Sequence, residues 1–281
     1  MRILGIVTLF NPPAAFVENV MSYAPHVEGL YLWDNTPGLG AQLSLPADIA
    51  AKVACRRQGR NVGIAKAFND AAAFALEKGY THLLTMNQDC RFEPGTFEAY
   101  RHAIEADNDP LHYAFTPRIN RPATDGGEVR ECGGMIVAGT VFTARCLREV
   151  GAFMENLVID AVDTEYLLRI HRCGGKVMEV AAGSLAHEVG HPLQRRFLFF
   201  RPVSLNYPPI RTFYIARNLL YLRRTYPEFR RRDLMWTLVW KRPLYILFIE
   251  PDKGAKLAAW ARGVWLGLRG RLQPDPYYRQ L

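Results

Sequence analysis

Short apolar runs alternate with helical segments over the first two thirds of the chain, and turn-forming residues close the first two runs. Residues 3–9 end at Asn-Pro-Pro, and residues 29–33 end at Asp-Asn-Thr-Pro-Gly. Residues 65–78 are rich in alanine, have apolar side chains at helical spacing, and are followed by Gly79, a typical C-terminal cap. Strands separated by helices of this length pair in parallel through right-handed crossovers, so the chain is predicted to form an open α/β sheet flanked by helices.

The remaining elements follow the same pattern. Further strands are expected at residues 49–54, 83–86, 113–117, 135–142 and 176–181, and further helices at 14–24, 94–107 and 161–172. In open α/β sheets ligands bind beyond the carboxyl ends of the strands. This places Asp34, Asn35, Asn61 and the run 87–89 on one predicted ligand-binding rim.

Charge divides the chain into two parts. Residues 1–190 hold 17 Lys and Arg against 22 Asp and Glu, whereas residues 191–281 hold 18 against 5. We therefore expect an α/β domain at 1–190 and a basic helical region at 191–281. Within that region aromatic and basic residues alternate at 195–201 and 211–224, and the apolar run 234–249 is broken by Lys-Arg-Pro.

The basic region has two interpretations. Aromatic and basic residues on short helices suit an anionic membrane surface, and they also suit a helical cap with a solvated basic face. No nucleic-acid recognition motif accompanies the charge, so no nucleic-acid partner is expected. The five cysteines are scattered and the first residues do not resemble a signal peptide, which favours the cytoplasm. Under the first interpretation the basic region would lie on the inner face of the cell membrane.

Asp89 is the first candidate for chemistry. It directly follows the apolar run 82–87, at the end of a predicted strand. Mg²⁺ keeps few protein ligands and takes the others from phosphate oxygens and water, so one or two carboxylates are enough to hold it. An aspartate that merely caps the next turn fits this position equally well.

Three acids form the second candidate, at the start of the predicted helix 161–172. Asp160, Asp163 and Glu165 lie within six residues. Acids at a helix N-terminus are stabilised by the helix dipole, which is the structural explanation. The functional alternative is a general base that accepts the proton of an attacking hydroxyl.

His187 and the loop 60–64 complete the set. Residues 187–191 read His-Glu-Val-Gly-His, but zinc proteases carry His-Glu-x-x-His on a helix, and the internal glycine and the following Pro192 disfavour a helix here. His187 is therefore better interpreted as a ligand of a phosphate-bound ion of the Mn²⁺ class. Asn61 and Gly63 enter a helix, where backbone N–H groups can meet a nucleotide.

Taken together, these segments resemble glycosyltransferase family 2, the inverting enzymes with a GT-A fold, and within it the bacterial rhamnosyltransferases of O-antigen and related polysaccharides. The similarity extends over about residues 3–225. The matching pieces are residues 7–12, Trp33-Asp34-Asn35, residues 61–65 with Asn69, Asn87-Gln88-Asp89, residues 158–166 with Arg169, and Arg217-Asn218.

The resemblance implies a nucleotide-sugar site, with dTDP-L-rhamnose as the donor. The residues that it implies for donor binding are Thr8, Asn11, Asp34, Asn35, Asn61, Gly63, Asn69, Asn87 and Gln88. Asp89 would bind Mg²⁺ or Mn²⁺ bridging the diphosphate, with His187 as a second ligand.

For catalysis the resemblance implies Asp163 as the base, Glu165 as the residue that orients the acceptor, and Asp160 as a competing base. The acceptor would be a saccharide or a lipid-linked saccharide in cell-surface polysaccharide synthesis. One departure is Asn87, where the family usually has an acid, so the metal site has one carboxylate and one amide. This departure motivates the alternative of a catalytically silent GT-A scaffold. A nucleotidyltransferase would need a Gly-rich basic loop after the first strand, and Leu-Phe-Asn-Pro-Pro does not provide one.

Overall fold

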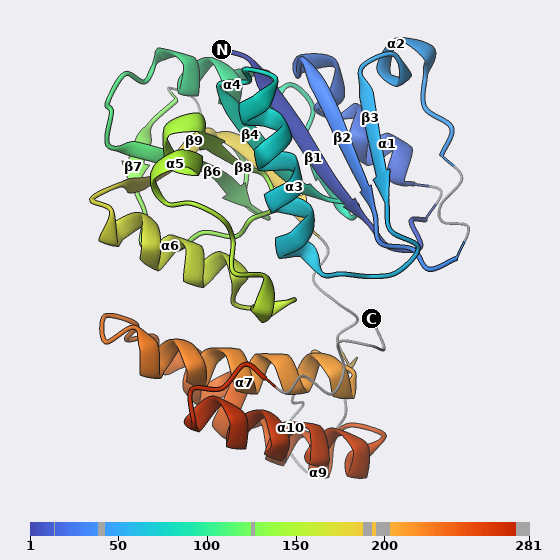
Figure 1. Cartoon of the computed structure of the whole chain (residues 1–281), viewed down its shortest axis with the longest axis vertical. Coiled ribbons are helices and arrows are strands. Elements are labelled where there is room, and N and C mark those ends of the chain that lie inside the picture. The colour runs from blue at the N-terminus through green and yellow to red at the C-terminus, as the bar shows by residue number, and fades with distance from the viewer. Residues whose placement is uncertain (14, 39–42, 125–126, 188–192, 195–202, 274–281) are drawn as a thin grey trace. The chain divides into compact units, whose positions relative to one another are not determined.

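A computed structural model describes the chain except residues 14, 39–42, 125–126, 188–192, 195–202 and 274–281 (Figure 1). The chain divides into two compact units. Unit 1 comprises residues 1–155 and 169–188, and unit 2 comprises residues 156–168 and 189–280. The predicted aromatic and basic run 195–201 lies outside the described residues.

Unit 1 contains one large sheet. Its strands are β1 (Ile3–Leu9), β2 (Gly29–Asp34), β3 (Val53–Arg57), β4 (His82–Asn87), β5 (Cys90–Phe92), β6 (His112–Ile119), β7 (Val129–Glu131), β8 (Thr140–Thr143) and β9 (Lys176–His187). The strand order is β3-β2-β1-β4-β8-β6-β9-β5, with β7 paired to β9. The first four strands run parallel, as do β6 and β9, while β8 runs antiparallel between β4 and β6. The predicted α/β sheet is confirmed.

Helices cover both faces of this sheet. They are α1 (Phe16–Met21), η1 (Ala24–His26), α2 (Ala47–Ala50), α3 (Ile64–Glu77), α4 (Thr96–Ala106) and α5 (Ala144–Glu149). The short turn η2 (Glu155–Leu157) and the helix α6 (Val162–Arg172) each contain residues of both units. Ile3 and Val7 of β1 belong to the buried cluster that contains aromatic rings of α1 and α4. On the opposite face Tyr31 of β2 lies 5.1 Å from the ring of Phe74 on α3, which crosses the front of the sheet in Figure 1. Every residue of β1 and β2 is buried, as expected for parallel strands between two layers of helices.

Unit 2 is mainly helical. Its elements are β10 (Leu193–Gln194), β11 (Val203–Ser204), α7 (Pro209–Thr225), α8 (Arg232–Leu234), the π-helical turn η3 (Met235–Trp240), α9 (Arg242–Phe248) and α10 (Lys253–Leu268). Two glycines let α10 approach α7 closely. A Cβ atom on Gly263 would lie 2.5 Å from the Phe213 carbonyl, and one on Gly267 would lie 2.7 Å from the Arg217 carbonyl. In the part of the chain that is described, no helix is both long and apolar enough to cross a membrane.

Three predicted elements differ from the structure. Residues 47–50 form a helical turn after Pro46, so the third strand starts at Val53 rather than at residue 49. The strand expected at 135–142 is shorter and spans residues 140–143, because Gly139 has a positive φ of 78° that interrupts an extended backbone. The helix expected at 14–24 is split, since the 3₁₀ turn at 24–26 has Pro25 in its first turn.

Candidate functional site

The sheet register aligns the ends of three strands. Thr8 of β1 pairs with Asn87 of β4 on one side and with Trp33 of β2 on the other, and Leu9 pairs with Asp34. Thr8, Asp34 and Asn87 therefore end neighbouring parallel strands at the same edge. These strand ends share one edge, as predicted, and that edge is the candidate donor-binding rim.

Asp34 and Asn35 support the loops around this rim. The buried Asp34 carboxylate accepts hydrogen bonds from the Thr36 N–H at 2.8 Å and from Arg57 Nε at 3.1 Å. The Asn35 side-chain oxygen accepts from Trp33 Nε1 at 2.9 Å and from the Val62 N–H at 3.2 Å. These contacts connect the end of β2 to β3 and to the loop before α3.

The loop before α3 is shaped by Asn61 and Gly63. The Asn61 side-chain oxygen accepts the Gly63 N–H at 2.9 Å, and Gly63 has a φ of 84°, which favours glycine. Asn11, after β1, also has a positive φ of 46°, and its N–H donates to Thr36 Oγ1 at 2.9 Å. Both loops are thus held by short polar contacts at the rim.

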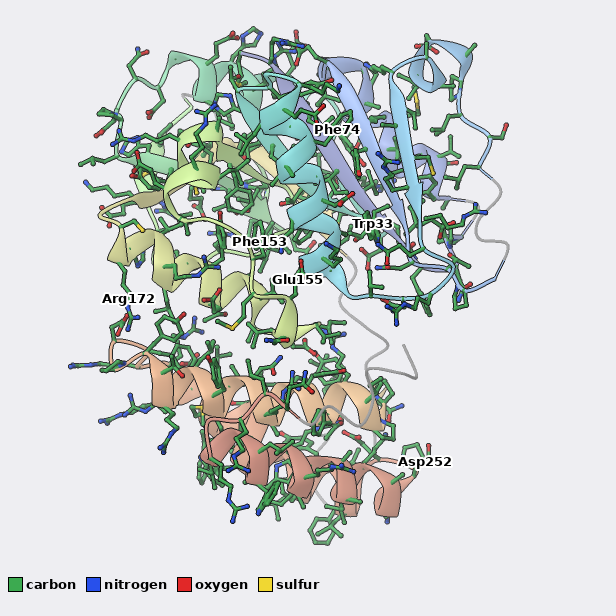
Figure 2. All side chains as sticks on the ribbon, in the orientation of Figure 1. Trp33, Phe74, Phe153, Glu155, Arg172 and Asp252 are labelled. Atoms are coloured by element: carbon green, nitrogen blue, oxygen red, sulfur yellow. The ribbon has the colours of Figure 1, made fainter. Side chains whose placement is uncertain are left out.

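Asn69 has a different environment from the one expected. Its amide binds the backbone of Phe153 in both directions, with N···O distances of 2.7 and 2.9 Å, and donates to Glu155 Oε1 at 2.9 Å. Phe153 also packs against Phe68 with ring centroids 5.4 Å apart (Figure 2 labels Phe153 and Glu155). In this structure Asn69 connects α3 to the turn at residues 153–155, and no nucleotide contact is needed to explain it.

Gln88 joins the loop after β1 to the end of β4. Its side-chain oxygen accepts the Phe10 N–H at 2.8 Å, and its side-chain nitrogen donates to the Phe10 carbonyl at 3.0 Å. The Gln88 carbonyl accepts from Asn19 of α1 at 2.8 Å. The Gln88 side chain thus adds two hydrogen bonds beyond the last β1–β4 pair and fixes the backbone that leads to Asp89.

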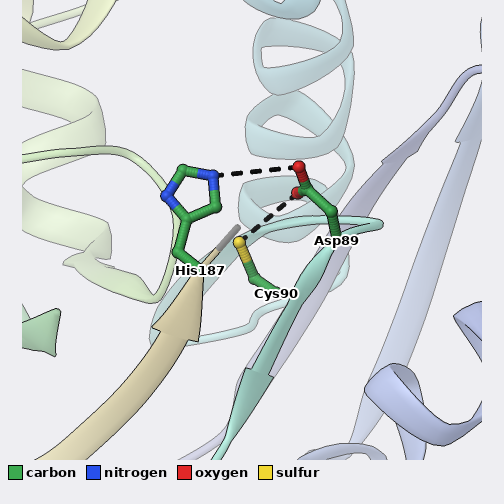
Figure 3. Close-up of side chains that lie close together, drawn as sticks. All are labelled: Asp89, Cys90 and His187. Carbon is green, nitrogen blue, oxygen red and sulfur yellow. Dashed lines mark hydrogen bonds and ion pairs between the residues drawn. The ribbon is translucent and has the colours of Figure 1, made fainter. Parts of the chain in front are cut away.

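Asp89 and His187 come together through the pairing of β5 with β9. Cys90 lies directly opposite His187 in this antiparallel ladder, so Asp89 lies beside the imidazole (Figure 3). His187 Nε2 is 3.9 Å from Asp89 Oδ2, and the Cys90 thiol lies 3.5 Å from Asp89 Oδ1. One ligand atom from each of the three residues lies within 4.8 Å of the others.

The chemistry of this cluster fits a hard divalent cation. Burial raises the pKa of the Cys90 thiol, and the neighbouring Asp89 carboxylate raises it further, so Cys90 stays protonated. The Asp89 side chain is 46% exposed and His187 is 19% exposed, so both can be reached from solvent. A carboxylate with an imidazole suits Mn²⁺, and the carboxylate alone suits Mg²⁺.

The three acids of the second candidate belong to unit 2. Asp160 is paired with Arg211, with N···O distances of 3.0–3.2 Å. Glu165 is fully buried and accepts a hydrogen bond from the Tyr226 hydroxyl at 2.6 Å. Burial raises the pKa of Asp163, whose carboxylate accepts the Thr164 N–H at 2.7 Å.

The loop before Asp163 is held in an unusual conformation. Val158, Asp160 and Ala161 have φ between 59° and 66°, a region that residues with side chains rarely adopt. The buried Asn218 amide nitrogen lies 2.9 Å from each of the carbonyl oxygens of residues 157, 159 and 160. Arg217 donates to the carbonyl oxygen of residue 156 at 2.8 Å.

Sequence reasoning missed several contacts in this part of the chain. Arg211 and Tyr226 were not predicted as partners of Asp160 and Glu165, from which they are 51 and 61 residues distant. No local pattern signals such a pairing. The adjacent Arg217 and Asn218 could be singled out from the sequence only by resemblance, which did not indicate the carbonyl oxygens that they bind.

Comparison with known proteins supports the fold. No family model matches the chain. It is 27% identical to the dTDP-rhamnosyl transferase RfbF of Shigella flexneri over 184 aligned positions, which cover 59% of this chain and 61% of that protein. The chain thus spans less than two thirds of this curated relative.

Two solved structures share the architecture. GalNAc-T7 with UDP, GalNAc and Mn²⁺ superimposes with a TM-score of 0.55 and 12% identity, over 89% of this chain and 58% of that one. Residues 1–349 of S. aureus TarS with UDP-GlcNAc superimpose with a TM-score of 0.54 and 10% identity, over 100% of this chain and 92% of that one. The chain has the GT-A fold of these glycosyltransferases.

Proposed function

We propose that this GT-A chain is an inverting glycosyltransferase that moves L-rhamnose from dTDP-L-rhamnose to a saccharide or lipid-linked saccharide during cell-surface polysaccharide synthesis. The observation that supports it best is the Asp89–His187 pair, formed by strand register beside the rim of the sheet. The choice of sugar is supported by the likeness to a dTDP-rhamnosyl transferase.

Asp89 and His187 would hold Mg²⁺ or Mn²⁺ at this position. When bound, the ion supplies positive charge that neutralises the leaving diphosphate. Asn87, which ends β4 two residues before Asp89, offers an amide oxygen in place of a second carboxylate. The site therefore has a low negative charge, and we expect its affinity for the ion to depend strongly on the phosphates of the donor.

The donor nucleotide would occupy the rim formed by the ends of β1 and β2. Thr8 and Asn11 flank the loop after β1, and Asp34 and Asn35 end β2. Since the buried Asp34 carboxylate accepts hydrogen bonds from Thr36 and Arg57, we expect it to fix the loop that meets the base and ribose.

Asp163 is the best candidate for the base in the proposed reaction. The acceptor hydroxyl oxygen forms a bond to the anomeric carbon, the bond to the diphosphate oxygen breaks, and the hydroxyl proton passes to a carboxylate. Burial raises the pKa of both Asp163 and Asp160, which makes each a stronger proton acceptor than an ordinary aspartate. Asp160 is less suitable because Arg211 neutralises its charge, and the buried Glu165 would orient the helix rather than the acceptor.

The proposal is tested by measuring release of nucleoside diphosphate from a panel that includes dTDP-L-rhamnose and UDP-GlcNAc, with Mn²⁺ and with a chelator. Turnover with dTDP-L-rhamnose that the chelator abolishes, and that His187→Gln reduces, supports it. Loss of turnover in Asp163→Ala with donor binding retained supports the base, whereas retained turnover would assign that role to Asp160.

No turnover with any donor, together with no metal-dependent nucleotide binding, would identify a silent GT-A scaffold and reject the enzyme. Release of pyrophosphate from a nucleoside triphosphate would instead identify a nucleotidyltransferase. Turnover with UDP-GlcNAc alone would retain the glycosyltransferase and reject rhamnose.

A further inference from the structure

One helical segment of unit 2 is apolar on both of its sides. It comprises α8, η3 and α9, from Arg232 to Phe248. Its inner side buries Val239 and Ile246 completely. Its outer side exposes five large apolar residues, with exposed fractions of 42–58%: Trp236, Trp240, Leu244, Leu247 and Phe248.

The five exposed residues form one stripe, which we call the outer stripe. They follow one another at intervals of four, four, three and one, the spacing of a single helix face. The first part of this segment is a π-helical turn, in which the Lys241 N–H bonds to the Trp236 carbonyl five residues earlier. A surface helix normally presents polar residues to water, so this stripe is expected to meet another apolar phase.

Positive charge accompanies the outer stripe. Residues 223–242 contain seven Lys and Arg against two Asp and Glu. Arg230 and Arg232 are exposed just before the stripe, and Lys241 lies within it, with Nζ 5.8 Å from the centroid of the Trp236 ring. Arg242 is different, since it is buried against Glu250 and contributes to folding.

We propose that the outer stripe is a docking surface for a bilayer with anionic headgroups. Tryptophan, leucine and phenylalanine on one helix face, bordered by Lys and Arg, have the composition of helices that lie in the membrane interface. The charge selects against a second copy of this chain, because two such surfaces would bring like charges together. The surface is separate from the proposed transfer reaction, and its binding needs no sugar donor.

The test is co-sedimentation of the full chain with vesicles of phosphatidylcholine, with and without phosphatidylglycerol. Binding should require phosphatidylglycerol and weaken as salt is added. The Trp240→Ser, Leu244→Ser double variant should lower the partition coefficient at least about tenfold, because both side chains are exposed and their loss removes apolar contact without disturbing the core. Leu111→Ser is the matched control, since it removes a 43% exposed leucine of unit 1 and should leave binding unchanged.

A second variant isolates the charge. Lys241→Gln with Arg232→Gln should weaken binding by about 25-fold, because each basic residue near an anionic surface contributes roughly fivefold. Circular dichroism checks that each variant is folded. Equal binding of wild type and the Trp240→Ser, Leu244→Ser variant, or equal binding to both vesicle types, would overturn the proposal. A dimer that dissociates in that variant, without vesicle binding by the wild type, would overturn it in favour of self-association.

Discussion

Asn218 provides a sharp test of how the loop before α6 is held. Asn218→Asp keeps the shape of the side chain and replaces its donor nitrogen by an oxygen that faces three carbonyl oxygens, each 2.9 Å from the native nitrogen. An amide has two N–H groups, so two hydrogen bonds are lost and the buried carbonyls keep no donor from this side chain. Each buried group left unsatisfied costs about 1–3 kcal/mol, so the two lost hydrogen bonds predict a loss of about 2–6 kcal/mol in the free energy of unfolding.

Urea unfolding followed by tryptophan fluorescence measures this loss in the relevant part of the chain. Four of the five tryptophans lie at positions 236, 240, 260 and 265, within unit 2. Asn108→Asp is the matched control, because its amide donates to an exposed carbonyl at 3.2 Å and the change should alter stability by less than about 0.5 kcal/mol. If Asn218→Asp unfolded at the same urea concentration as the control, the idea that this amide maintains the left-handed loop would be wrong.

Four further predictions concern the site and its support. Asp89→Asn should weaken Mn²⁺ binding by roughly 10–100-fold, measured by calorimetry with the nucleotide present. Asp109→Asn is the control, because it alters an exposed carboxylate elsewhere in unit 1 and should leave the affinity unchanged. Equal Mn²⁺ affinities of the two variants would show that Asp89 is not a metal ligand. Because burial raises the pKa of Asp163, kcat/KM should fall with decreasing pH at a value above the ordinary aspartate pKa of about 3.9. The raised pKa of Asp163 also means that the folded state binds the proton more tightly than the unfolded state, so the stability from this group is lost as pH rises through the raised pKa. Asp163→Asn should therefore stabilise unit 2 at neutral pH. A destabilised variant would contradict this. Tyr226→Phe should lower the free energy of unfolding by about 1–3 kcal/mol, since the buried Glu165 loses a donor 2.6 Å away, and unchanged urea unfolding would show that this hydrogen bond contributes little.

The sheet could be predicted from sequence because its signals are local. The apolar runs of β1, β2 and β4 are followed by turn residues, and a glycine follows the helix α3. Each element can therefore be recognised from a short stretch of sequence. The predicted strand bounds were wrong where a single residue changes the backbone conformation. Pro46 starts a helical turn in place of a strand, and the left-handed Gly139 shortens β8.

The rim was predictable as a set of positions but not as a set of contacts. The ends of parallel strands meet at one edge whatever their sequence, so Asp34 and Asn87 could be placed together. The partners of Asn69 and Glu165 depend on tertiary packing across 61–86 residues, and no pattern in the chain encodes them. Polar residues that look like ligands in a sequence can thus be occupied by the protein itself.

The β5–β9 ladder limits which insertions and deletions the sequence can accept during evolution. Adjacent residues of a strand point to opposite faces, so the position of His187 beside Asp89 depends on counting residues along both strands. Substitutions at Arg91 or Ala186, which pair with each other, leave that count intact. Inserting or deleting one residue in 185–187 would turn the imidazole to the other face, and the same change in 90–92 would shift Asp89 out of register with it. Length, more than residue identity, is therefore the quantity that selection should hold constant in these two short segments.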